Sequence, residues 1–216
     1  MKKLSVVLVA LAIVLGVGGA ACAAPYVSLN MGTVWVNDSD YNYAEPYGGD
    51  PNYRDEGELS FDTGFVLNAA FGYAYDNGFR AELEYGFRAN DLDKADGTEY
   101  YLGDSYNYSE SLSGDVMTNS FMVNGFYDFA PRSPVSPFVG AGIGFANIEG
   151  DIDFQPDTDD DNVFAYQLAA GVAFALNPMM KIDVQYRFFG TEDPEFYGLE
   201  AEYLTHNLMI GLRTSF

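Results

Sequence analysis

The stretch Phe79–Asn90 reads FRAELEYGFRAN, and apolar and polar side chains alternate along it. A period of two predicts a β-strand whose two faces meet different surroundings. The apolar face consists of Phe79, Ala81, Leu83, Tyr85, Phe87 and Ala89, and the polar face of Arg80, Glu82, Glu84, Gly86, Arg88 and Asn90. One face therefore suits lipid or a protein core, and the other suits water or a network of paired charges.

Seven further stretches alternate in the same way, which gives eight predicted strands. The eight are Tyr26–Asn37, Leu59–Asp76, Phe79–Asn90, Val116–Phe129, Pro137–Ile148, Val163–Leu176, Met180–Phe189 and Tyr203–Phe216. Each is long enough to cross a bilayer at a tilt, which takes about 9 to 11 residues. If the mature chain spans a membrane, it must do so as a closed barrel, because lipid offers no partners for backbone N–H and C=O groups.

The connections between these strands alternate between long and short. The long polar ones are 38–58, 91–115, 149–162 and 190–202, and the short ones are 76–78, 130–136 and 177–179. Asn77-Gly78 in the first short turn is a strong tight-hairpin signal. Short turns at one end and long loops at the other are typical of outer-membrane barrels. The pattern predicts an all-β fold, an eight-stranded antiparallel up-and-down transmembrane β-barrel with a polar lumen, long extracellular loops and short periplasmic turns.

Alternation alone does not decide which face of each strand lies inside. A soluble lipocalin-like barrel would turn the apolar face inward around a ligand. Glycines on the polar face, aromatic residues near the strand ends and an aromatic last residue favour the membrane arrangement instead. The predicted aromatic girdles are Tyr73, Phe79, Tyr127, Phe129, Phe174 and Phe216 at one end and Trp35, Phe61, Phe87 and Phe188 at the other.

The N-terminal segment 1–23 is predicted to be an export signal, and residues 24–216 the barrel domain. Two lysines precede the apolar run Leu4–Val17, and Ala21-Cys22-Ala23 fits a small-residue cleavage site after Ala23. A lipoprotein signal with a lipid on Cys22 is the alternative. Cleavage would leave no cysteine, so we expect no disulfide framework.

Acidic residues dominate the predicted loops. The chain has 32 acidic and 10 basic residues, a formal net charge of −22. The four loop ranges hold seven, seven, seven and five of the acids, against only Arg54 and Lys94. Such a surface repels a phosphate backbone, which argues against a nucleic-acid partner.

Charges within the strands fall on the polar face and balance in sign. The predicted lumen network consists of Asp62, Glu82, Glu84, Asp128 and Asp183 with Arg80, Arg88, Lys181, Arg187 and Arg213. Eight strands enclose an interior that side chains can fill, and an unpaired buried charge costs several kcal/mol. We expect a nearly neutral, filled lumen, and a narrow channel gated by shifting ion pairs is the alternative.

Five segments resemble the opacity-type, OmpA-like family of outer-membrane barrels and surface antigens. They are SFMVNGFYDF at 120–129, PFVGAGIGF at 137–145, AYQLAAGVAF at 165–174, DVQYRFF at 183–189 and GLRTSF at 211–216. The resemblance implies a bacterial outer-membrane location, variable surface loops, and insertion by the barrel assembly machinery through the last strand. The residues that match the family's C-terminal insertion signal are Leu208, Ile210, Leu212 and Phe216.

Candidate residues for chemistry are few. His206, the only histidine, lies near the end of a predicted strand. Lipid A deacylases have a histidine at a similar position, but with a serine two residues later, where this chain has Leu208. Asp157, Asp159 and Asp161 alternate as oxygen ligands for Ca²⁺ would, but the EF-hand glycine and glutamate are missing. A solvated acidic loop is the alternative, and diffuse binding of divalent cations by the loops a broader hypothesis.

These observations predict a non-enzymatic outer-membrane surface barrel without a cofactor, in an envelope or adhesion-type role. Its expected partners are outer-membrane lipid and lipopolysaccharide, the assembly machinery, and an extracellular partner bound through tyrosine-rich loops such as Tyr41–Tyr53. Those loops could equally be mobile and solvated. A narrow porin-like channel and a lipid-modifying enzyme remain the alternative functions.

Overall fold

A computed structural model shows an all-β protein, and it describes residues 23–44, 46, 48, 50–111, 113–152, 159–192, 194–196, 199–200 and 203–216. The strands are β1 (Ala23–Val36), β2 (Ser39–Tyr43), β3 (Arg54–Phe61), β4 (Gly64–Tyr75), β5 (Phe79–Tyr101), β6 (Asp104–Ser111), β7 (Gly114–Asp128), β8 (Val135–Ile152), β9 (Asp159–Ala175), β10 (Met180–Thr191), β11 (Glu195–Phe196), β12 (Leu199–Glu200) and β13 (Leu204–Ser215). Among these described residues, no helix is both long enough and apolar enough to cross a membrane.

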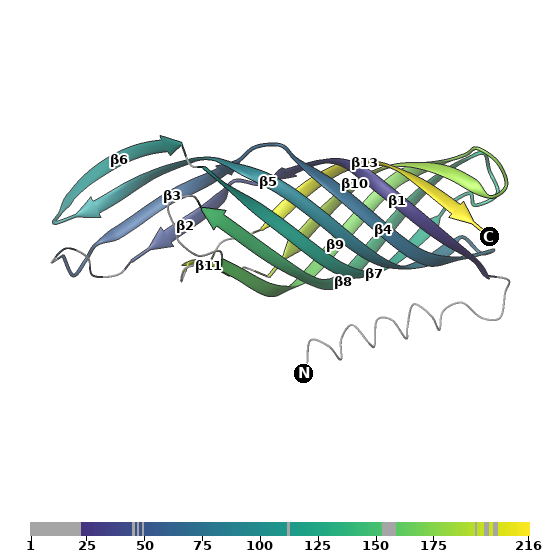
Figure 1. The fold of residues 1–216 in the computed structure, drawn as a ribbon, viewed down its shortest axis with the longest axis horizontal. Coiled ribbons are helices and arrows are strands. Elements are labelled where there is room, and N and C mark those ends of the chain that lie inside the picture. Colours follow the sequence, from purple (N-terminus) through teal and green to yellow (C-terminus); the bar gives the residue numbers. More distant parts are fainter. Residues whose placement is uncertain are drawn as a thin grey trace.

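Eight of the strands close into a ring (Figure 1). Its antiparallel order is β1, β4, β5, β7, β8, β9, β10 and β13, and β13 pairs back to β1. Following paired residues once around the ring leads from Ser136 to Ala146 on the same strand, a stagger of ten residues. A stagger of this kind accompanies the strand tilt of a closed barrel. The predicted eight-stranded up-and-down barrel is therefore confirmed.

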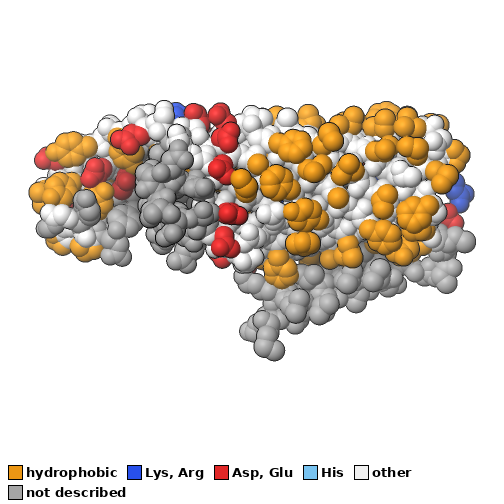
Figure 2. Space-filling model, in the orientation of Figure 1, with side chains coloured by type: hydrophobic (Ala, Val, Ile, Leu, Met, Phe, Trp, Pro, Cys, Tyr) orange, Lys and Arg blue, Asp and Glu red, His pale blue; other side chains and the backbone are white. Residues whose placement is uncertain are grey.

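The two faces of the strands lie as the membrane arrangement requires. Leu83 is 51% exposed and Phe121 68% exposed on the outside, whereas Arg88 is fully buried inside. Hydrophobic side chains accordingly cover the barrel wall (Figure 2). An apolar exterior around a charged interior is the reverse of a soluble barrel, so the lipocalin-like alternative is wrong.

The predicted loops 38–58 and 91–115 are not irregular, contrary to expectation. β5 is 23 residues long and continues beyond the ring, where it pairs with β3 and β6, and β3 pairs with β2. These strands form an antiparallel sheet, which we call the outer sheet: β2, β3, residues 92–101 of β5, and β6 (Figure 1). Tyrosine and threonine, which favour strands, occur in these segments. Their otherwise polar composition suggests loops, so these strands are not evident from the sequence. The end of the barrel that carries this sheet is the outer end.

The predicted strand Leu59–Asp76 is wrong as one unit. It divides into β3 and β4, separated by Asp62 and Thr63, and the pairing of β3 with β5 shifts register between Ser60 and Phe61. Because Ser60 pairs with Lys94 and Phe61 with Leu92, the extra residue of this bulge is Asp93 of β5. At the opposite end of the barrel, the expected Asn77-Gly78 turn is confirmed, and Gly78 has a positive φ of 93°.

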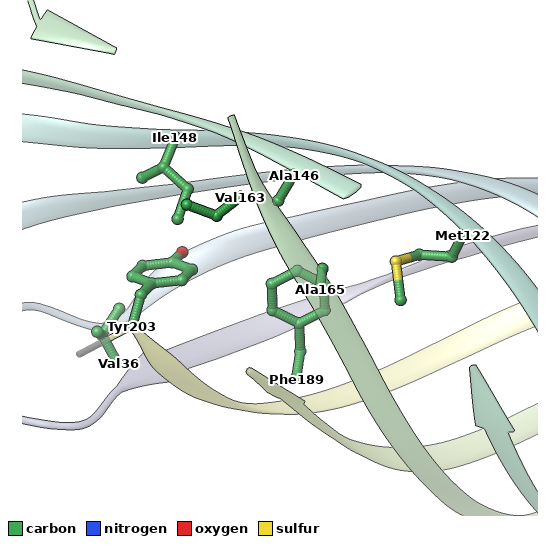
Figure 3. Close-up of a cluster of buried hydrophobic side chains, with 8 residues drawn as sticks. All are labelled: Val36, Met122, Ala146, Ile148, Val163, Ala165, Phe189 and Tyr203. Carbon is green, nitrogen blue, oxygen red and sulfur yellow. The ribbon is translucent and has the colours of Figure 1, made fainter. Parts of the chain in front are cut away.

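The lumen contains apolar clusters as well as charges. The largest lies near the outer end and consists of Val36, Met122, Ala146, Ile148, Val163, Ala165, Phe189 and Tyr203 (Figure 3). We call it the outer cluster. A second cluster joins Phe126, Phe138, Ala169 and Ala173, and a third joins Val34, Val66 and Met209. The expectation of a polar lumen is therefore too simple, because apolar layers alternate with the charged ones.

Candidate functional site

The outer sheet is the most acidic and most tyrosine-rich part of the described chain. Its strands hold nine acidic residues and six tyrosines, against two basic residues, Arg54 and Lys94. Acidic side chains gather in a band where the apolar barrel surface ends and continue onto the outer sheet (Figure 2). Charge and aromatic side chains thus face solvent together on a surface beyond the barrel.

Side-chain hydrogen bonds tie the strands of the outer sheet together. The Tyr108 hydroxyl on β6 reaches past β5 and donates to the Asp55 carboxylate on β3 at 2.8 Å. Thr98 donates to Asn107 at 2.9 Å between β5 and β6. These bonds supplement the backbone ladder, so the sheet is a defined surface and not a set of independent loops.

The tip of the outer sheet is organised by a buried carboxylate. Asp50 is 6% exposed, and its two oxygens accept hydrogen bonds from the backbone N–H groups of Asn52, at 2.9 Å, and Leu102. Leu102 and Gly103 both have positive φ, as a type I′ hairpin turn requires. Asp50 therefore fastens the loop before β3 to the turn between β5 and β6.

A cavity of about 590 Å³ lies at this tip, which we call the tip pocket. It is lined by Asp50, Asn52, Arg54, Tyr100, Leu102, Gly103 and Asp104. The Arg54 guanidinium stacks 4.0 Å from the Tyr100 ring centre and lies 3.6 Å from the Glu56 carboxylate. The volume is typical of small-ligand pockets, and the lining offers donors, acceptors, both charges and an aromatic ring.

We expect Asp50→Ala to loosen the tip without unfolding the barrel. The substitution removes the acceptor for two backbone N–H groups, a loss worth about 1–3 kcal/mol for a buried group. Limited proteolysis in detergent should then cleave within 44–53 or 101–104 faster than in the parent. Asp104→Ala, at the same tip, is the control, and equal cleavage rates for both variants would contradict the anchoring role of Asp50.

An exposed ion pair lies in the middle of the outer sheet. Lys94 Nζ lies 2.6 Å from the Asp96 carboxylate. The hydrogen bond from Lys94, supplemented by one from Ser109, lowers the pKa of Asp96, and the bond to Asp96 raises the pKa of Lys94. Exposed pairs of this kind contribute little to stability because water and salt screen them.

At the inner end of the lumen, five of the predicted network residues form one connected cluster. Arg80 contacts Asp128 at 3.0 Å and Glu82 at 2.9 Å. Arg213 contacts Asp183 at 2.8 Å and Asp128 at 3.5 Å. All five side chains are almost fully buried. A connected set of this kind satisfies charges that would be costly alone.

Farther along the lumen, Glu84 and Arg187 form a second buried pair. Both Glu84 oxygens lie 2.6 Å from Arg187 Nη1, and Gln167 donates to Glu84 at 3.0 Å. Arg187 Nε also donates to Gln185 at 3.0 Å. The pair is held between amide side chains from β9 and β10, so it is a fixed structural contact.

Two of the ten predicted network residues lie elsewhere. Asp62 is exposed in the break between β3 and β4, and the adjacent Phe61 packs against the outer cluster instead of facing lipid. Both residues lie at the break between β3 and β4, where the alternation expected of one continuous strand ends. Lys181 is half-buried at the inner rim, where it donates to the Pro131 carbonyl at 3.1 Å.

Several lumen residues were not foreseen because they are aromatic or neutral. Tyr26 donates to Glu82 and lies 3.3 Å from Arg80, and the Arg80 guanidinium lies 4.4 Å from the ring centre of Phe126. Asn68 and Asn124 are also buried in the lumen. All of these residues lie on the inner face of their strands. Their positions in the alternating pattern of the sequence are therefore the signal that could have identified them.

The remaining predicted residues lie on outer surfaces. Leu208, Ile210, Leu212 and Phe216 all face outward on or just after β13. His206 is on the same side, with Nδ1 bonded to the Tyr186 hydroxyl and its ring against Tyr186 and Phe188. Asp157 lies outside the described residues, nothing is described of the Asp159 side chain, and Asp161 accepts from the Asn162 N–H at 2.7 Å. In the part of the chain described, no three acidic, histidine or cysteine side chains converge as a metal site.

Comparison with known proteins gives a consistent result. The family model described as "Outer membrane protein beta-barrel domain" matches residues 7–216. A putative adhesin of Rickettsia conorii is 29% identical over 212 residues, covering 87% of this chain and 80% of that protein. An uncharacterized protein of Brucella abortus is 26% identical over 182 residues, and the match spans 74% of this chain and 63% of the relative's length.

A solved structure shows the same fold. The crystal structure of neisserial surface protein A matches with a TM-score of 0.57 and 18% sequence identity, over 90% of this chain and 99% of that protein.

Proposed function

The chain belongs to the family of outer-membrane β-barrel domains, and from this premise we propose that it is a non-enzymatic surface protein whose outer sheet makes adhesion-type contacts outside the cell. The family places the barrel in the bacterial outer membrane. Short turns at the inner end and a long sheet at the outer end then assign the outer sheet to the extracellular side.

One observation carries this proposal: the polar surface beyond the membrane is an ordered sheet with a fastened tip. Asp50 at the tip and the Tyr108–Asp55 bond across β5 hold it in one shape. A preorganised surface loses less entropy on binding than a mobile loop does. Exposed tyrosines such as Tyr106 supply contact area of the kind that binding loops use. The Rickettsia relative's description as a putative adhesin agrees with this role.

The charge of the outer sheet limits the chemistry of its partner. Its nine acidic residues against two basic ones repel anionic surfaces and attract basic ones. We propose a basic or neutral partner on the extracellular side. The band of carboxylates at the barrel rim would also bind divalent cations diffusely next to anionic lipopolysaccharide. Insertion through the outward-facing residues of β13 requires the barrel assembly machinery.

An enzymatic role has less support. The His206 ring packs between Tyr186 and Phe188 on the outer face of the barrel, and Leu208 two residues later points to lipid. A hydrolytic site needs a nucleophile within reach of its base. His206→Ala should therefore leave lipid A and adhesion unchanged, as mass spectrometry of extracted lipid A and a cell-binding assay would show.

The proposal is tested by removing the outer sheet and keeping the barrel. In this variant, which we call the mini-barrel, short Asn-Gly turns join Val36 to Gly64 and Asp91 to Asp115, the last two being direct neighbours in the ladder. Non-adherent laboratory bacteria displaying the parent should bind cultured animal cells, and those displaying the mini-barrel should bind at background. Heat-modifiability on denaturing gels verifies that the mini-barrel is assembled. Equal binding by both proteins would contradict the proposal.

A further inference from the structure

Arg88 differs from the other arginines of the lumen. It is fully buried, yet within the described chain no carboxylate lies within 4.0 Å of it, whereas Arg187 contacts one carboxylate and Arg80 and Arg213 contact two each. Its partners are neutral: Asn207 at 3.3 Å, Ser120 at 3.2 Å and the face of Phe189, with 3.8 Å to the ring centre. A buried cation without a counter-charge is costly, so its environment demands an explanation.

The inner and outer halves of the lumen differ in how well their charges balance. The inner cluster holds two arginines and three carboxylates, and the half-buried Lys181 at the inner rim offsets the surplus negative charge. Above it, Arg88 and Arg187 face only Glu84, and both Glu84 oxygens already contact Arg187 at 2.6 Å. Among the residues that the structure describes, the outer half of the lumen therefore carries one uncompensated positive charge, at Arg88.

Two buried hydroxyl groups lie near Arg88, those of Thr118 and Tyr203. They lie within hydrogen-bonding reach of each other, and neither has a further partner among the described residues. Thr118 is the direct cross-strand neighbour of Arg88. Tyr203 packs edge-on against Phe189, the ring that Arg88 covers, and lies near both the Arg88 charge and the Thr118 hydroxyl. Because only one of the two hydroxyls donates to the other, the second hydroxyl proton remains free to donate next to the Arg88 guanidinium.

We propose that this region binds a small monovalent anion, with chloride as the expected ion. The Arg88 guanidinium supplies the charge, and the Thr118–Tyr203 hydroxyl pair supplies a further donor. The apolar side chains of the outer cluster, including Val36 and Ile148, lie around Tyr203 (Figure 3), and Arg88, Thr118 and Tyr203 are all buried. A low local dielectric strengthens the attraction between ion and guanidinium. The bound anion neutralises the outer half of the lumen and stabilises the barrel from within.

The test uses the full barrel refolded in detergent with sodium chloride, bromide or gluconate at equal ionic strength. We expect the midpoint of the heat-modifiability transition to lie several degrees higher in chloride and bromide than in gluconate, because gluconate is too large for the site. Arg88→Met should lose this difference, and Arg54→Met, which removes an exposed arginine, should keep it. Crystals grown in bromide should show an anomalous peak within hydrogen-bonding distance of Arg88.

A second variant keeps the proposal testable if Arg88→Met does not fold. Tyr203→Phe retains the ring in the outer cluster and removes only one donor, so its halide-dependent shift should shrink while the barrel still assembles. A halide response of the same size in the parent, Arg88→Met and Tyr203→Phe would overturn the proposal. Absence of a bromide peak at Arg88 would overturn it as well.

Discussion

Arg187→Met is expected to destabilise the barrel by about 3–5 kcal/mol, the cost of leaving one member of a buried ion pair without its partner. Glu84 would lose its 2.6 Å contacts and keep only the neutral Gln167 at 3.0 Å. Both side chains of the pair are at most 2% exposed, so water cannot replace the lost partner. Urea titration of the protein in detergent micelles, followed by tryptophan fluorescence of Trp35, measures the loss.

Two other arginine variants serve as comparisons for this prediction. Arg54→Met on the outer sheet removes a half-exposed pair with Glu56 and should change the unfolding free energy by less than about 1 kcal/mol. Arg88→Met leaves no carboxylate unpaired, so it should destabilise much less than Arg187→Met does. Equal losses for Arg187 and Arg54 would show that the Glu84–Arg187 pair is solvated and that the lumen is not filled as described.

Gly144→Val is expected to have the next largest effect, through steric conflict with the neighbouring strand. A Cβ at Gly144 would lie 2.0 Å from the Phe121 carbonyl oxygen and 2.7 Å from Met122 Sδ. The carbonyl belongs to the backbone of β7, which pairs with β8 at this point, so it cannot move without breaking the ladder. Overpacking of this kind costs about 3 kcal/mol. The heat-modifiable compact form should melt at lower temperature or fail to appear.

Gly125→Val is the matched control for Gly144→Val. It is also a strand glycine, in β7, but a Cβ there would meet nothing within 4 Å. We expect this variant to assemble at parental yield, since valine suits a strand. If both variants assembled equally well, close packing of the glycine-lined inner face would be contradicted.

The barrel could be predicted from sequence because one physical rule governs every strand in it. Lipid outside and paired charges inside force alternation at each step, as in Arg80, Glu82, Glu84 and Arg88 against Leu83 and Tyr85. The same rule placed Arg187 and Arg213 in the lumen. It could not pair them, because partners such as Glu84 and Arg187 lie far apart in the chain and meet only through the ring's register.

Other features were missed where that rule does not apply. Beyond the membrane both faces of a strand meet water, so β6 and the outer half of β5 show no alternation. The sequence of these segments therefore predicts loops. The break between β3 and β4 at Asp62 and Thr63 accounts for two wrong assignments, because the period-two pattern of the sequence runs through it without a visible interruption. The tip pocket depends on Asp50 meeting the turn at Leu102, a contact between distant residues that no local motif indicates.

The central claim is that the strands form a sealed scaffold and that the function lies in the outer sheet. Planar-bilayer recording of the purified barrel tests this most directly, with a large-pore porin under the same conditions as a positive control. The packed charges and the outer cluster predict a flat baseline without stable unit steps at voltages where the control conducts. Reproducible unit conductance would contradict the account, because it would show an open path through the lumen and favour a channel function.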